Sequence, residues 1–162
     1  MDLFRFFRRK DYSRNFLNRM VIGLGVGLVK SRTHILSPDF GPQGSMDVLA
    51  TWMGQEVAKE LLNQKKINTN SSKSEVIESV LDEVRIAEDL EISFDNNSAH
   101  IAVQQCLICP RRVGGYDLEG HTACPVGGIL RGAINLVTGK SPQVKRIALR
   151  PAEICQIDFE LS

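Results

Sequence analysis

Apolar residues recur at spacings of three and four positions in three stretches of the chain, a period typical of helices that bury one face. The stretches cover residues 45–63, 72–90 and 125–138. The second opens with Ser72 and Glu75 at the spacing of a capping box, in which each side chain satisfies a backbone amide of the other residue. The sequence therefore predicts three amphipathic helices, the first preceded by a Pro- and Gly-rich break.

Alternation of apolar and polar residues indicates strands elsewhere in the chain. Residues 92–94 and 99–106 predict a hairpin around a polar turn, and residues 144–150 and 154–161 predict two further strands. Together with the helices, these strands predict an α+β fold. We expect an antiparallel sheet of about four strands flanked by helices, with an N-terminal amphipathic helical arm.

The N-terminal segment combines positive charge with aromatic residues. Its first 20 residues hold the basic side chains of Arg5, Arg8, Arg9, Lys10, Arg14 and Arg19 beside several phenylalanines. This pattern predicts a basic amphipathic helix. An extended stretch should follow over residues 20–36, in which Gly23, Gly25 and Gly27 allow close backbone packing. Residues 1–36 are thus expected to form an arm, and residues 37–162 the domain.

The arm is expected to dock on the body of its own chain or on a second copy. Phe4, Phe6, Phe7 and Phe16 would otherwise expose an apolar patch larger than soluble monomers usually tolerate, which predicts a homodimer with the arm buried. Acidic side chains predominate between residues 75 and 95. This stretch is either a solvated helix face or a surface for the basic arm of a partner subunit.

Composition limits the classes of partner. The chain has 162 residues and a formal net charge of +1, so its overall charge gives no indication of nucleic acid binding. The apolar run over residues 20–29 falls short of the ~18 residues needed to cross a bilayer, and no cleavage pattern follows it. We therefore expect no nucleic-acid partner, no membrane insertion and a cytoplasmic location, where cysteines stay reduced and tend to bind metal.

The four cysteines carry the strongest chemical signal. Cys106 and Cys109 form a C-x2-C pair at the end of a predicted strand, Cys124 precedes a predicted helix, and Cys155 lies on the inward face of the last strand. Thiolates from three elements can surround one tetrahedral ion, which predicts a structural zinc held by all four. His121 competes with Cys155 for the fourth position. An iron–sulfur cluster is the alternative cofactor, and Cys155 could instead be only a small core residue.

The sequence indicates no catalytic residue. It contains no nucleophile elbow, no cleft-like pair of carboxylates and no phosphate loop. His34 and His100 have no acidic or cysteine neighbours at ligand spacing. They are therefore interpreted as surface residues or as hydrogen-bonded core residues.

Three short motifs suggest a family. They are a cysteine before a glycine-rich helix (Cys124-Pro-Val-Gly-Gly-Ile-Leu), a late-strand cysteine with a closing aromatic-acid pair (Cys155-Gln-Ile-Asp-Phe159-Glu), and the helix segment 52–59. The order of the first two, together with the helix segment, resembles the 4-vinyl reductase domain family of predicted hydrocarbon-binding proteins. The resemblance implies an α+β domain that is often dimeric, and zinc in several members.

The same resemblance implies part of the ligand set. Two of the family's zinc ligands match Cys124 and Cys155, whereas its other two, a glutamate and a cysteine on the intervening strand, have no counterpart in residues 144–147. Cys106 and Cys109 are available to replace them. This departure supports the four-cysteine set if the strand that carries Cys106 pairs near Cys155.

The functional expectation is a zinc-containing domain that binds or senses a small hydrophobic or aromatic ligand without turnover. Its pocket would be lined by Trp52 and Met53 of one helix and by Ile129 and Leu130 of another, although both faces could equally pack directly on the sheet. A reductase of a vinyl or other unsaturated group is the alternative that the family name suggests. A subunit that only supports assembly is the second alternative.

Overall fold

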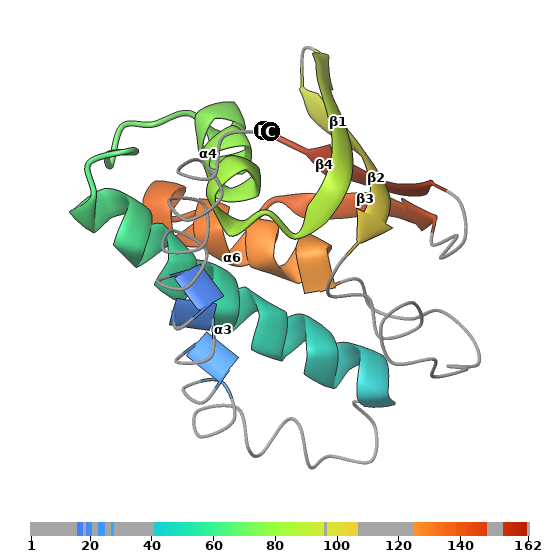
Figure 1. Ribbon diagram of the computed structural model, residues 1–162, viewed down its shortest axis with the longest axis horizontal. Helices are drawn as coiled ribbons and strands as arrows, with labels where there is room; N and C mark the ends of the chain where they lie inside the picture. Colours follow the sequence, from blue (N-terminus) through green and yellow to red (C-terminus); the bar gives the residue numbers. More distant parts are fainter. Residues whose placement is uncertain are drawn as a thin grey trace, which may run out of the picture.

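The computed structural model describes residues 16, 17, 19, 20, 23, 24, 27, 41–95, 97–106, 125–148 and 154–161. Along the chain the elements are α3 (Gly41–Asn63), α4 (Lys73–Val84), β1 (Ala87–Asp95), β2 (Ser98–Cys106), α6 (Pro125–Thr138), β3 (Gln143–Ala148) and β4 (Cys155–Glu160). Figure 1 shows these helices gathered on one side of the sheet. The predicted α+β fold with an antiparallel sheet of four strands is confirmed, whereas the boundary expected between residues 36 and 37 lies outside the described residues.

Local chemistry accounts for the limits of α4. The Glu75 amide donates to the Ser72 hydroxyl at 3.3 Å and the Ser72 amide donates to the Glu75 carboxylate at 2.7 Å, which confirms the capping box. The helix ends at Val84 because Arg85 adopts a left-handed conformation, with φ of 48°. The helix expected to reach residue 90 is therefore too long, and β1 begins at Ala87.

Two other expectations about local structure are also wrong. α3 begins at Gly41, before the predicted start at Ser45, because a proline such as Pro42 is compatible with the first turn of a helix, where no amide hydrogen bond is needed. Among residues 20–36, expected to be extended, the described residues 20, 23, 24 and 27 are helical. Close packing explains their glycines: a Cβ on Gly23 would lie 2.5 Å from Cα of Met53.

The sheet has the strand order β1-β2-β4-β3, and all neighbouring strands are antiparallel. The chain leaves β2, forms α6, continues through the edge strand β3 and returns as β4 between β3 and β2. In the β2–β4 register, Ile101 lies opposite Ile157 and Ala99 opposite Phe159. The centre of the sheet is therefore built from strands that are distant in sequence.

Alternation along the strands gives the sheet two different faces. The face toward the helices is apolar: Ala99, Ile101, Val103, Cys155, Ile157 and Phe159 are all buried. The opposite face, called the open face below, carries Asp89, Glu91, Ser93, Asp95, His100, Ala102, Gln156 and Asp158. Most of these side chains are exposed, so the helices cover one side of the sheet and leave a polar surface on the other.

α3 and α6 cross with their backbones in contact. A Cβ added to Gly54 of α3 would lie 1.9 Å from the carbonyl oxygen of Ile129, and one added to Gly132 of α6 would lie 1.9 Å from that of Thr51. Only a residue without a Cβ fits at either position. The two glycines thus set the closest approach of the helices.

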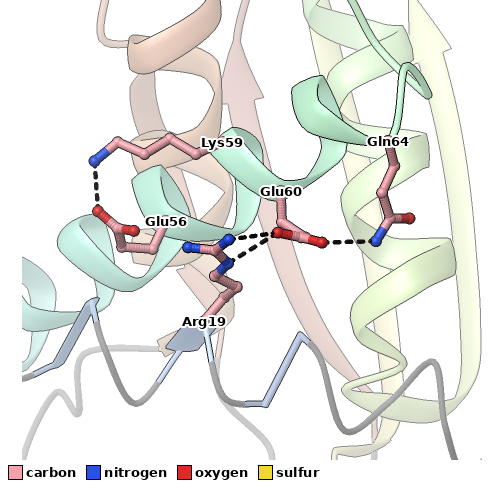
Figure 2. A network of polar contacts seen from close by, with 5 residues as sticks. All are labelled: Arg19, Glu56, Lys59, Glu60 and Gln64. Atoms are coloured by element: carbon pink, nitrogen blue, oxygen red, sulfur yellow. Dashed lines mark hydrogen bonds and ion pairs between the residues drawn. The ribbon is translucent and has the colours of Figure 1, made fainter.

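The described part of the N-terminal segment packs on its own chain. Phe16 and Met20 are buried in the core, at 1% and 5% exposure. Figure 2 shows how a polar network on α3 holds the same segment: Arg19 donates from Nε to Oε2 of Glu60 at 2.9 Å, and Gln64 donates to the other oxygen of Glu60 at 2.9 Å. The bond from Gln64, followed by that from Arg19, lowers the pKa of Glu60. Docking on the body of its own chain is confirmed for these residues.

Candidate functional site: the open face of the sheet

A hollow of about 790 Å³ lies on the open face of the sheet. Its lining comes from β1, β2 and β4 and comprises Glu91, Ile92, Ser93, His100, Ile101, Ala102, Gln156 and Asp158. The small side chain of Ala102 lies directly between Glu91 and Gln156 in the register of the three strands. The polar side chains around this position leave room for an occupant with hydrogen-bonding or charged groups.

His100 is held between two carboxylates at one edge of the hollow. Its Nδ1 lies 2.9 Å from Oδ1 of Asp158, the residue directly opposite on β4, and its Nε2 lies 3.0 Å from Oδ2 of Asp95 at the end of β1. A neutral imidazole has only one N–H, so both contacts are hydrogen bonds donated by the ring only when it is protonated. The geometry therefore favours the imidazolium form.

The electrostatic consequences follow from these bonds. The hydrogen bond to Asp95, and after it the bond to Asp158, raises the pKa of His100 above its ordinary value of 6.5. The bond from His100, followed by that from the Asn97 amide, lowers the pKa of Asp95. With His100 protonated and both aspartates ionised, the cluster still carries one net negative charge. Glu91 adds a further carboxylate to the hollow.

Other charges on this side of the sheet come from β1, β4 and β3. Asp89 stands on β1 with the same alternation as Glu91, and Glu160 stands on β4 with the same alternation as Asp158. On β3, Arg146 occupies the register position opposite Asp158. Carboxylates thus outnumber basic residues on the open face within the described strands.

The structure separates two of the cysteines that were predicted to share a zinc ion. Cys106 and Cys155 are both buried, at 8% exposure. Cys155 lies opposite Val103, three positions before Cys106, which corresponds to about 10 Å along the strand. Two thiolates at Zn–S distances of ~2.3 Å need their sulfur atoms within about 4 Å of each other. This register therefore does not place Cys106 and Cys155 as neighbours.

The two thiols also belong to different faces. Cys155 continues the buried row of Ile157 and Phe159, as expected for a small core residue. Cys106 shares the alternation of His100 on the open face, yet it is buried. The remaining predicted ligands, residues 109, 121 and 124, lie outside the described residues. Within the described part of the chain, no three His, Cys, Asp or Glu side chains are grouped as a metal site.

The residues predicted to line an apolar pocket lie at the crossing of α3 and α6. Ile129 and Leu130 are fully buried, whereas Trp52 and Met53 are partly buried. The close approach at Gly54 means that the helices contact each other directly at this point. A ligand at this crossing stays a prediction, and the hollow described above lies on the other side of the sheet.

The carboxylate partners of His100 were missed in the sequence for a clear reason. Asp95 lies across the hairpin turn and Asp158 lies 58 residues away, so neither stands at the spacing of a local motif. The pairing of His100 with Asp95 could have been inferred from the predicted turn, which brings residues 93–95 opposite residues 98–100. Asp158 required knowledge of the β2–β4 pairing.

Comparison with known proteins gives two findings. The sequence profile of the MJ0207 family matches residues 16–161. A protein of Methanocaldococcus jannaschii described as uncharacterized protein MJ0207 is 29% identical over 161 residues, which cover 99% of each chain.

Among the described helices, none is sufficiently long and apolar to cross a membrane.

Proposed function

We propose that this chain, which belongs to the MJ0207 family, is a binding module that holds a positively charged ligand on the open face of its sheet. The observation that carries the proposal is the hollow of about 790 Å³. It is bordered by Glu91, Asp158 and His100, whose ring lies between Asp95 and Asp158. An ammonium or guanidinium group placed there would meet carboxylates from two strands. Arginine in particular can form paired hydrogen bonds with a carboxylate.

Binding without turnover fits the state of His100 better than catalysis does. A general base needs a nitrogen lone pair within reach of a substrate proton. Both ring nitrogens of His100 instead face carboxylates, at 2.9 and 3.0 Å. The histidine therefore acts as a fixed part of the site wall, and the ligand is expected to leave unchanged.

The experiment is a titration of the protein with spermidine and with arginine amide at low salt, followed by calorimetry and backbone amide NMR. We expect chemical-shift changes at residues 91–93, 100–102 and 156–158. Glu91→Gln should weaken binding, whereas the matched variant Glu78→Gln, which removes an exposed carboxylate from α4, should not. Absence of binding, or equal effects of the two variants, would overturn the proposal.

The same titration separates this proposal from binding of an apolar ligand at the crossing of α3 and α6. Naphthalene serves as the apolar probe. Shifts near Trp52 and Met53, with none on the open face, would support the hydrophobic-ligand hypothesis instead. The direct contact of the two helices at Gly54 and Gly132 favours the opposite result.

We also propose that one zinc ion stabilises the end of β2. The set that best fits the β2–β4 register is Cys106, Cys109, His121 and Cys124, with Cys155 left in the core. This proposal is supported by the burial of the Cys106 thiol on a face whose other side chains are mostly exposed. In the four-cysteine set, by contrast, the strand would have to bend to bring Cys106 to Cys155. Bound zinc would connect the end of β2 to residues 109, 121 and 124, and it would supply no reaction step.

A further inference from the structure

We infer that the open face of the sheet is the docking surface for the basic N-terminal segment, residues 5–14, of a second copy of this chain. The inference rests on the proposed function, because it identifies the positively charged ligand of the same site. The first ground is complementary charge. Asp89, Glu91 and Asp95 on β1 and Asp158 on β4 face the same side.

The proposed occupant carries the matching groups. Its basic residues are Arg5, Arg8, Arg9, Lys10 and Arg14, against a single acidic residue, Asp11. Close spacing of guanidinium groups along a short segment suits a surface on which carboxylates alternate along two strands. Few cations of the described strands compete for this face: His100 is held between Asp95 and Asp158, and β3 carries Lys145 and Arg146, with Arg146 at the register position opposite Asp158.

The second ground is the position of the residues that anchor the segment to the domain. Phe16 and Met20 are buried, and Arg19 is paired with Glu60 of α3. Figure 1 shows the described residues of this segment against α3, on the side of the sheet where the helices gather. The anchor of the segment therefore lies on the helical side of the sheet, whereas the open face is the other side.

The length of the segment then decides whether it can bind the open face of its own chain or only that of a second copy. The pattern of residues 1–15 predicts a helix, and fifteen helical residues span about 22 Å. A compact domain of this length is about 40 Å across. A helical segment anchored at Phe16 is thus too short to pass around to its own open face, whereas a partner's open face can be brought directly against it.

The first experiment mixes full-length chains labelled with nitrogen-14 and nitrogen-15 and treats them with a zero-length carbodiimide cross-linker. Lys10 is the only lysine among the first 29 residues, so its peptides identify the segment. We expect cross-links from Lys10 to Glu91 or Asp95, with one peptide of each isotope. Cross-links of a single isotope would place the segment on its own chain and overturn the inference, as would their absence.

The second experiment measures the dimer dissociation constant by sedimentation equilibrium. Asp89→Asn with Glu91→Gln removes two charges from the open face, and Glu78→Gln with Asp82→Asn removes two exposed charges from α4 as the matched control. Surface ion pairs contribute ~0.2–1 kcal/mol each, so the first variant should weaken the dimer about 2- to 30-fold and the control should not. Higher salt should weaken the unmodified dimer. A monomer at all concentrations, or equal effects of the two variants, overturns the inference.

A third measurement distinguishes failure of this inference from failure of the proposed function. In the variant Arg8→Gln with Arg9→Gln, the competing segment is weakened, so spermidine should bind the open face more tightly than in the unmodified protein. Equal spermidine affinity in both proteins overturns the docking of the segment and leaves the proposed function standing. Absence of spermidine binding in both proteins overturns the two together.

Discussion

Replacing Gly54 by alanine tests the closest contact in the fold. The added Cβ would lie 1.9 Å from the carbonyl oxygen and 2.7 Å from the carbonyl carbon of Ile129. Ordinary contacts of a Cβ begin at 3.4 Å, so α3 and α6 would have to separate by about 1.5 Å. The obstacle is the backbone of α6, which cannot move aside by changing a rotamer.

The magnitude follows from two opposing terms. Overpacking of a well-packed interface costs about 1–3 kcal/mol, and a clash with backbone belongs at or above the upper end. Alanine recovers ~1 kcal/mol because glycine is the poorer helix former. We therefore expect Gly54→Ala to lower the free energy of unfolding by about 2 kcal/mol, which for a chain of this size corresponds to a fall in Tm of about 4–8 °C.

The assay is thermal and urea denaturation of the single variants Gly54→Ala and Gly132→Ala and of the double variant. Because both alanines separate the same pair of helices, the cost of the double variant should be less than the sum of the single costs. Gly139→Ala is the control: nothing lies within 4 Å of a Cβ there, and only its φ of 71° opposes the substitution. An unchanged or raised Tm for Gly54→Ala would refute direct packing and would favour a cavity between the helices.

Three further predictions concern charge and metal. Because the pKa of His100 is raised, its contribution to stability is fully present below pH 6.5 and is lost as pH rises through the folded pKa; His100→Gln should remove this loss from urea unfolding curves measured between pH 5 and 9. Arg19→Met should cost ~0.2–1 kcal/mol at neutral pH, and the lowered pKa of Glu60 means that this difference should vanish as pH falls below 4.5. Metal analysis should find one zinc per chain, lost in Cys106→Ser and kept in Cys155→Ser; loss in both would restore the four-cysteine set.

Elements whose limits depend on neighbouring residues were predictable from the sequence. The helix from Pro125 to Thr138 ends at Gly139, which has the positive φ expected of a residue that closes a helix. The capping box at Ser72 is present with both of its hydrogen bonds. In each case the signal and the structure it produces lie within a few residues of each other.

The misassigned stretch between residues 85 and 91 shows where local reasoning fails. Glu, Asp and Leu are compatible with a helix, and the preceding residues are helical. However, Leu90 and Ile92 alternate with Asp89 and Glu91, and pairing with β2 stabilises the strand. The period-two signal was present in the sequence but short, so the preceding helical period concealed it.

The different roles of the two faces of the sheet could also be recognised only in the structure. The inner face packs against the helices, and the helices contact each other through Gly54 and Gly132, so this side of the molecule is occupied by its own core. Because the β2–β4 pairing joins residues about 58 positions apart, the aspartates around His100 meet only when the sheet forms. Binding at the open face would therefore depend on the complete sheet. A ligand that contacts β1, β2 and β4 together would in turn stabilise their pairing, since it binds the folded state alone.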